Sequence, residues 1–199
     1  RAYFFLGLSM AALTEAIGID TIFGYAPIIY QKAGFADPSA AIAATAATNL
    51  VQALSALFIM VFIDRSRRKI LLSWGLFLAG FMLLLLSLAF WLLAGSAALP
   101  WVVLVLMILL SAGYTFYFIS VAWVVITEIF HPNVRPLGLA LATVISYVFI
   151  VILSQFYLDL ARVLSLGGLF FLFSCICFAS IYFVTKILVE TKDIKHVRL

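Results

Sequence analysis

Long apolar runs are the feature that most limits how this chain can fold. Six stretches carry few charges, and short polar segments separate them: residues 3–30, 39–63, 70–94, 101–130, 137–161 and 168–188. A helix needs about 20 mostly apolar residues to cross a bilayer, whereas a barrel strand is about ten residues long and alternates in polarity. We therefore expect an all-α membrane protein with six transmembrane helices.

The composition agrees with a lipid environment. The chain is 67% hydrophobic and its mean hydropathy is +1.27, whereas soluble domains are about 45–50% apolar. The six stretches use most of the 199 residues, so we expect the lipid bilayer as a partner and no soluble domain between the helices.

The basic residues predict the orientation of the bundle. With six spans, the N-terminus, the second and fourth loops and the C-terminal tail lie on one side. Ten of the twelve Lys and Arg residues fall there, and the other two are Lys32 and Arg162. Because positive loops stay in the cytoplasm, we expect both ends to be cytoplasmic, in the plasma membrane. This asymmetry also accounts for the net charge of +4 without a nucleic-acid partner.

The densest group of charges is DRSRRK, residues 64–69. Acidic residues stand beside basic ones at three helix ends on this same side. Single surface ion pairs contribute little, but a network between helix ends can close in one conformation and break in another. We expect a conformational charge network, formed by Asp64, Arg65, Arg68, Glu128, Arg135 and Glu190.

The chain lacks the local patterns of common enzymes. It contains no phosphate-binding Walker loop, no nucleophile elbow and no pair of His residues at metal-binding spacing. An intramembrane aspartyl protease needs acids on two facing helices, but Glu15 and Asp20 share one predicted helix, about 140° apart around its axis. We expect no enzyme activity, no cofactor and no metal.

Four segments carry a family resemblance. They are GIDTIFGYAPIIYQKAGF (18–35), DRSRRK (64–69), WVVITEIFHPNVRPLGLALAT (123–143) and VETKD (189–193). In this order they resemble motifs of the sugar-porter branch of the major facilitator superfamily, from the seventh helix of the full carrier to the end of its last helix.

The resemblance implies the C-terminal six-helix bundle of a twelve-helix carrier, with the N-terminal half as its partner. Such a bundle consists of two inverted three-helix repeats with the solute held near the midplane, here 1–96 and 97–199. The implied function is transport of a small polar solute, a sugar or polyol, by alternating access, as a symporter or uniporter. The alternative is a carrier-like membrane subunit or sensor that transports nothing.

The resemblance also implies a solute site. Sugars need amide or carboxylate groups for their hydroxyls and an aromatic plane for their C–H face. By position in the motifs, and by sharing a helical face with them, the substrate-binding residues are Thr14, Glu15, Asp20, Tyr25, Asn49, Gln52, Trp123, Ser146 and Tyr147.

Two departures from the family pattern bear on this site. Glu15 and Asp20 replace amides, so they accept hydrogen bonds from a polyol, hold a proton, pair with a cationic solute, or are structural and capped by neighbouring hydroxyls. Two prolines before Trp123 are also absent, since residues 119–122 read Ile-Ser-Val-Ala. We therefore expect the fourth span to lack its built-in break.

Overall fold

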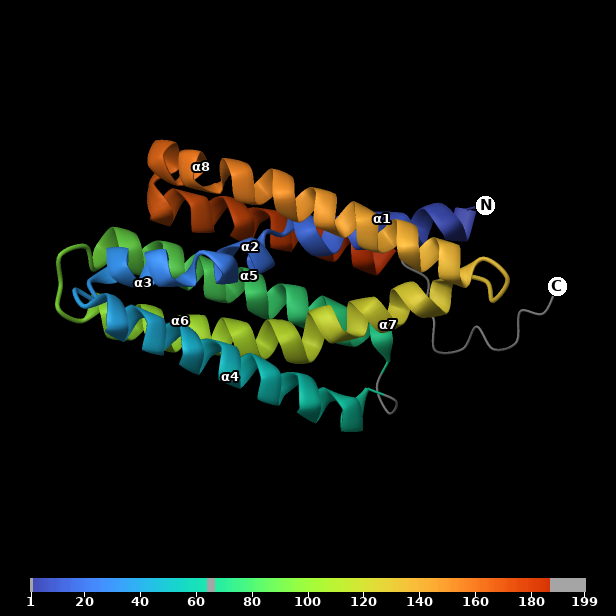
Figure 1. The fold of residues 1–199 in the computed structure, drawn as a ribbon, viewed down its shortest axis with the longest axis horizontal. Coiled ribbons are helices and arrows are strands. Elements are labelled where there is room, and N and C mark those ends of the chain that lie inside the picture. Colours follow the sequence, from blue (N-terminus) through green and yellow to red (C-terminus); the bar gives the residue numbers. More distant parts are fainter. Residues whose placement is uncertain (1, 64–66, 187–199) are drawn as a thin grey trace.

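The computed structural model describes residues 2–63 and 67–186, and within these ranges all regular structure is helical (Figure 1). The prediction of an all-α protein is thereby confirmed. The elements in chain order are α1 (Ala2–Ala16), α2 (Ile19–Gly24), α3 (Ala26–Ala33), α4 (Pro38–Phe62), α5 (Arg68–Leu92), α6 (Leu99–Gly113), the π-helix η1 (Tyr114–Ile119), α7 (Ser120–Ile129) and α8 (Arg135–Lys186).

The helix α8 contains two antiparallel segments. Its 52 residues would extend for about 78 Å at 1.5 Å per residue, more than twice the ~30 Å hydrocarbon core. At Ser165 the backbone has φ 63° and ψ 167°, and the chain folds back on itself there (Figure 1). The five helical segments long and apolar enough to cross a membrane thus provide six crossings, as the sequence predicts.

The first span is broken twice. Gly18 ends α1 with a left-handed φ of 70°, and its N–H donates to the Glu15 carbonyl at 2.8 Å. A Cβ at Gly18 would lie 2.2 Å from the ring of Phe173, so the close approach of that ring also requires glycine. The second break is at Tyr25, and Pro27 then lies in the first turn of α3, where its missing N–H costs nothing.

The fourth span, α6–η1–α7, runs from Leu99 to Ile129 without a non-helical residue. Its centre is nevertheless distorted, because residues 114–119 form a π-helix. The predicted absence of a proline break is correct, but no feature of the residue pattern predicts this wider turn.

The helix ends sort onto two sides of the bundle. Figure 1 places the start of α1, the end of α4, the junction of α7 with α8 and the end of α8 at one end. At the other end, the side chain of Asp37 caps α4 and accepts from the Ser39 N–H at 3.0 Å. Hydrogen bonds from Ser39 hold the pKa of Asp37 below its ordinary value.

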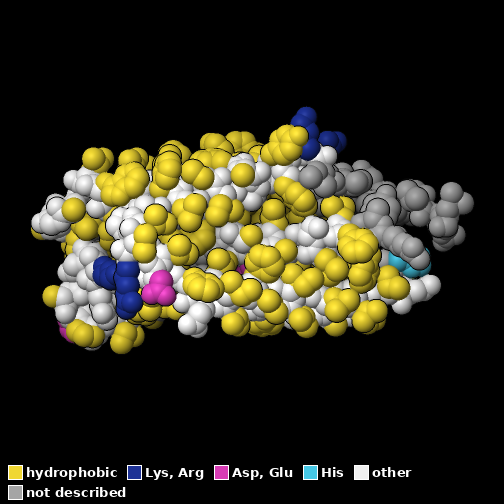
Figure 2. Space-filling view, turned by 90° about the horizontal axis from the view of Figure 1, so that it is seen from above, with side chains coloured by type: hydrophobic (Ala, Val, Ile, Leu, Met, Phe, Trp, Pro, Cys, Tyr) yellow, Lys and Arg dark blue, Asp and Glu magenta, His cyan; other side chains and the backbone are white. Residues whose placement is uncertain are grey.

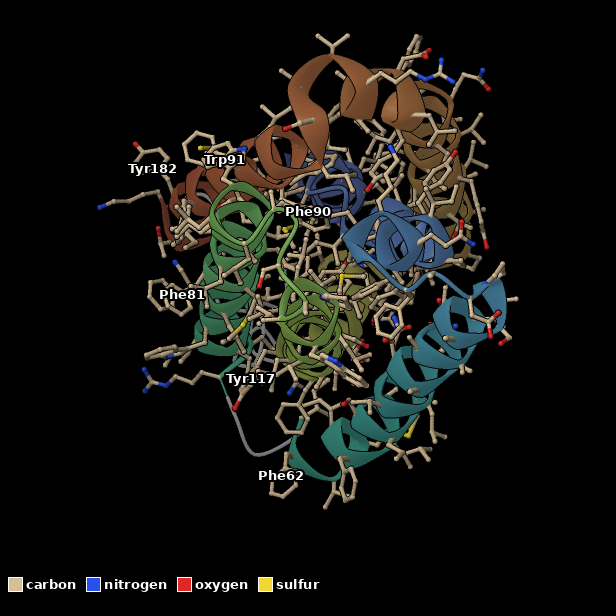
Figure 3. All side chains as sticks on the ribbon, turned by 90° about the vertical axis from the view of Figure 1, so that its left-hand side faces the viewer. Phe62, Phe81, Phe90, Trp91, Tyr117 and Tyr182 are labelled. Atoms are coloured by element: carbon tan, nitrogen blue, oxygen red, sulfur yellow. The ribbon has the colours of Figure 1, made fainter. Side chains whose placement is uncertain are left out.

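Between the two ends the surface is apolar. Figure 2 shows hydrophobic side chains along the length of the bundle and few charged ones on the visible face. Viewed from one end, Phe81, Trp91 and Tyr182 lie on the outside and Phe90 lies further in (Figure 3). Phe90 packs on Phe170 with ring centroids 5.6 Å apart, so aromatic residues serve both the lipid-facing surface and the core.

The helix α5 lies against α6, η1 and the second segment of α8. Small residues allow close approach, since the Ser174 hydroxyl donates to the Gly80 carbonyl at 2.8 Å. Gly75 faces η1, where an added Cβ would lie 2.9 Å from the backbone carbon of Tyr117. The helix α4 is the more exposed partner, and it packs along α3, α6 and η1.

Candidate functional site

A cavity of about 380 Å³ opens between α4 and the η1–α7 segment. Asn49 and Gln52 are almost one turn apart on α4, so both side chains reach the same wall. Trp123 of α7 lies on the opposite wall. The remaining lining residues are Ala53, Ala56, Thr115, Ile119 and Ser120.

The chemistry of this cavity is neutral and polar. The two amides, Asn49 and Gln52, offer both donors and acceptors, and the indole of Trp123 adds an aromatic face. None of the described lining residues is charged. This arrangement suits a small uncharged molecule rich in hydroxyls.

The two acids form a separate cluster near the break in the first span. The side chains of Glu15 and Asp20 lie close enough to interact electrostatically, and the Tyr114 hydroxyl donates to Asp20 Oδ2 at 3.1 Å. Glu15 is 5% exposed and Tyr114 is fully buried. Neither acid lines the cavity between α4 and α7.

Thr14 and Ser146 meet at one carbonyl. The Thr14 hydroxyl donates to the Ala11 carbonyl at 2.7 Å, and the Ser146 hydroxyl donates to the same oxygen at 3.3 Å. Both residues are buried. The bond from Ser146 joins α8 to α1, whereas the bond from Thr14 stays within α1. Tyr147, the next residue, is 64% exposed and lies outside both clusters.

Tyr25 stands at the junction of α2 and α3. Its hydroxyl donates to the Ser154 carbonyl at 2.8 Å, and its ring stacks on Tyr157 with centroids 4.5 Å apart and planes at 4°. Tyr25 therefore fixes the second break of the first span against α8.

Of the expected charge network, the structure shows one ion pair in which both residues are described. Arg68 Nη2 lies 3.2 Å from Glu128 Oε1 and joins the start of α5 to the end of α7. Arg68 also donates to the Ile63 carbonyl. Arg135 is exposed at the start of α8. Asp64, Arg65 and Glu190 lie outside the described residues.

Sequence reasoning missed three polar residues of these clusters, Tyr114, Thr115 and Ser120. In the sequence, the aromatic residues of YTFYF (114–118) indicate packing or lipid contact. The π-helix at 114–119 changes the direction of the side chains relative to an α-helix. Periodicity in the sequence therefore does not predict where Tyr114 and Thr115 point. A weak signal was present, since Thr115 and Ser120 are polar residues within an apolar span.

The sequence model of the family described as "Sugar (and other) transporter" matches residues 1–198. Among curated relatives, the D-xylose transporter of Levilactobacillus brevis is 28% identical over 97% of this chain and 42% of its own length. The major myo-inositol transporter IolT of Bacillus subtilis is 28% identical over 98% and 41%. Probable polyol transporter 4 of Arabidopsis thaliana is 29% identical over 100% and 38%.

Solved structures share the fold. The xylose transporter XylE from E. coli, in an inward-open conformation, superposes with a TM-score of 0.80 at 20% identity, over 97% of this chain and 40% of that one. A double-tryptophan mutant of XylE gives 0.83 at 21% identity, over 96% and 41%. The chain thus spans about two fifths of the length of the proteins it matches.

Proposed function

The chain belongs to the sugar (and other) transporter family of the major facilitator superfamily, and on this premise we propose that it forms one six-helix half of a membrane carrier for a sugar or polyol. The observation that carries the proposal is the cavity between α4 and α7, where two amides and an indole face one another. An uncharged polyol matches these groups, because its hydroxyls both donate and accept.

The second half of the carrier completes the proposal. The cavity is open on one side, and the chain covers 42% or less of its curated relatives. A second bundle facing α4 would close the solute site, and rocking of one bundle against the other would alternate access. The partner is the N-terminal half of the same carrier.

We further propose that the two repeats are residues 1–96 and 97–199. Each contains three crossings, and the first crossing of each is distorted: at Gly18 in one and at 114–119 in the other. The two distorted regions meet, since Tyr114 bonds Asp20 and its ring lies 6.4 Å from that of Phe23. Interrupted helices at matching positions are typical of transporter sites.

The orientation follows from the charged end of the bundle. Arg67, Arg68, Lys69, Arg135 and Lys186 all lie at the end where α4, α7 and the second segment of α8 finish. By the positive-inside rule, this end is cytoplasmic, and the Arg68–Glu128 ion pair is part of the latch that closes the cytoplasmic side.

Uptake in intact cells tests the proposed function. The gene is deleted and restored at its chromosomal position, so that the chain is present with its natural surroundings. Labelled xylose, myo-inositol and glucose are then supplied. We expect the deletion to lose saturable uptake of at least one of them, and the restored gene to recover it. Equal uptake of all three with and without the gene would favour a subunit or sensor that transports no sugar.

A further inference from the structure

The outer surface of the bundle carries two exposed stripes, one on α5 and one on the second segment of α8. Exposed residues recur there every three or four positions, as they do on one face of a helix. They are Arg67 at the N-cap of α5, then Ile70, Trp74, Phe77 and Phe81, and on α8 Phe178, Tyr182 and Lys186. Each stripe therefore has aromatic rings along the bundle and one cation at the charged end.

The two stripes lie side by side. Gly80 of α5 packs on Cys177 of α8, since an added Cβ at Gly80 would lie 3.2 Å from the Cys177 Cβ. The start of α5 and the end of α8 lie at the same end of the bundle (Figure 1), so these helices are antiparallel. Trp74, six residues before Gly80, and Tyr182, five residues after Cys177, are therefore at nearly the same depth. Figure 3 shows Tyr182 and Phe81 on the same outer side.

The rings form one apolar surface that crosses from α5 to α8. Phe77 is at its centre: the centroid of its ring lies 6.0 Å from that of Trp74, 6.5 Å from that of Phe81 and 6.2 Å from that of Phe178. All four side chains are exposed. In a membrane, such a surface faces the acyl chains of lipids.

Arg67 and Lys186 stand at the charged end of this surface. Both side chains are exposed, and neither forms an ion pair with another of the residues that the structure describes. Arg67 is seven residues from Trp74 and Lys186 is four from Tyr182, distances of about 10 Å and 6 Å along the helices. Because Trp and Tyr favour the level of the headgroups and long basic side chains extend toward that level, both cations reach the lipid phosphates.

We propose that this face of α5 and α8 binds an anionic phospholipid, with its phosphate between Arg67 and Lys186. Its acyl chains lie along the rings of Trp74, Phe77 and Phe178. The charges are complementary, and basic sites between transmembrane helices recognise anionic headgroups. The bound lipid ties the start of α5 to the end of α8. This site goes beyond the proposed function, and it requires only that the chain spans a membrane.

Native mass spectrometry of the purified protein tests the site. Titration with phosphatidylglycerol gives a Kd, and phosphatidylcholine with the same acyl chains is the neutral reference. We expect phosphatidylglycerol to bind more tightly. Arg67→Gln with Lys186→Gln should weaken its binding by roughly 25-fold, about 5-fold for each cation, and leave the binding of phosphatidylcholine unchanged. Arg67→Lys with Lys186→Arg keeps both charges and should bind phosphatidylglycerol as the native protein does.

A matched control removes two cations elsewhere. Lys32 and Arg162 are exposed and lie away from the charged end. Lys32→Gln with Arg162→Gln lowers the net charge by the same amount, and it should keep the native preference for phosphatidylglycerol. Glycerol 3-phosphate, which has the charge without the acyl chains, should not displace the lipid.

The aromatic surface has its own test. Phe77→Ala with Phe178→Ala should weaken the binding of both lipids, because the acyl chains lose their contact. The competing occupant of this face is a second copy of the chain. Dimers of the native protein that form equally well without lipid and are lost in this variant would assign the face to self-association and overturn the proposal.

Other results would also overturn the site. Equal affinity of native protein and the Arg67→Gln, Lys186→Gln variant for phosphatidylglycerol would remove both cations from it. An equal loss in the Lys32, Arg162 control would mean that net charge alone acts. Displacement by glycerol 3-phosphate would indicate a site for soluble anions. The single variants Arg67→Gln and Lys186→Gln, each with an expected loss of about 5-fold, serve if the double variant does not fold. Since no step measures transport, failure of the proposed function would leave this result standing.

Discussion

Trp123 supplies the aromatic face of the cavity and is half-buried on α7. Removing its ring takes away the plane against which a sugar C–H face packs, and such aromatic contacts contribute about 0.5–1.5 kcal/mol beyond burial. We therefore expect Trp123→Ala to raise KM for uptake by roughly 2- to 12-fold, and Trp123→Phe to raise it less. The measurement is initial-rate uptake at equal membrane abundance.

Trp74 provides the comparison for Trp123. It is 61% exposed on α5 and away from the cavity, so Trp74→Ala should leave KM unchanged. An unaltered KM in Trp123→Ala, across xylose, myo-inositol and glucose, would remove Trp123 from the site.

The Arg68–Glu128 ion pair is part of the latch that we propose. The Arg68 side chain is 8% exposed and that of Glu128 31%, so the pair is better shielded than a surface salt bridge. Glu128→Gln removes one charge at nearly constant shape. We expect it to lower the maximal uptake rate while KM and membrane abundance change little, because the cytoplasmic closed state loses a contact.

Exchange of the charges is the sharper test of this pair. The double variant Arg68→Glu with Glu128→Arg should recover part of the rate lost by either single variant. An ion pair that serves only to anchor the helix ends would behave differently: uptake would then follow membrane abundance in every variant.

At the scale of helices, the packing of α5 against η1 depends on Gly75. An added Cβ would lie 2.8 Å from the Phe118 Cβ and 2.9 Å from the Tyr117 backbone carbon, and neither atom moves by a side-chain rotation. Overpacking of this kind costs about 1–3 kcal/mol. Gly75→Ala should therefore lower the melting temperature of the purified protein in detergent.

Gly24 is the control for this packing prediction. A Cβ there meets nothing within 4 Å, and its backbone is helical. Gly24→Ala should leave the melting temperature within a degree or two, or raise it slightly, as expected when glycine is replaced in a compatible conformation. If Gly75→Ala melts at as high a temperature as Gly24→Ala, then η1 moves away from the added Cβ without loss of stability, and the packing prediction is wrong.

The helices themselves follow well from the sequence. Length and apolar character give all six crossings, and Gly18 and Pro27 indicate breaks in the first one. The π-turn at 114–119 does not follow, because hydrophobic periodicity carries no signal for one extra residue in a turn. The bond from Ser120 to the Thr115 carbonyl and the close approach of Gly75 depend on tertiary packing.

The same limit applies to the candidate site. Asn49 and Gln52 are brought together by helical spacing alone, and the motif resemblance adds Trp123 across from them. The acids lie apart from this cavity, and Asp20 is held there by the Tyr114 hydroxyl. The direction of the Tyr114 side chain could not be predicted from the sequence.

For the whole molecule, the acid pair lies at the contact between the two proposed repeats. Glu15 and Asp20 come from the first crossing and Tyr114 from the fourth. The nearby titratable and polar groups are Thr14, Tyr114 and Cys177, and none of them is a cation. Two carboxyl groups that lie so close together favour binding a proton, because two like charges side by side repel each other. Release of that proton when the repeats move would couple transport to pH.

Replacing both acids by amides tests this coupling. We expect uptake by the native protein to fall as external pH rises, since fewer protons are available to the pair, and Glu15→Gln with Asp20→Asn to flatten this dependence while uptake of neutral sugars continues. The control is Asp37→Asn, because Asp37 is an exposed acid that caps α4 and asparagine also caps helices; it should keep the native pH profile. An unchanged profile in the double amide would assign both carboxyls a structural role. Loss of uptake of a cationic solute in that variant would instead mean that the acids bind the solute.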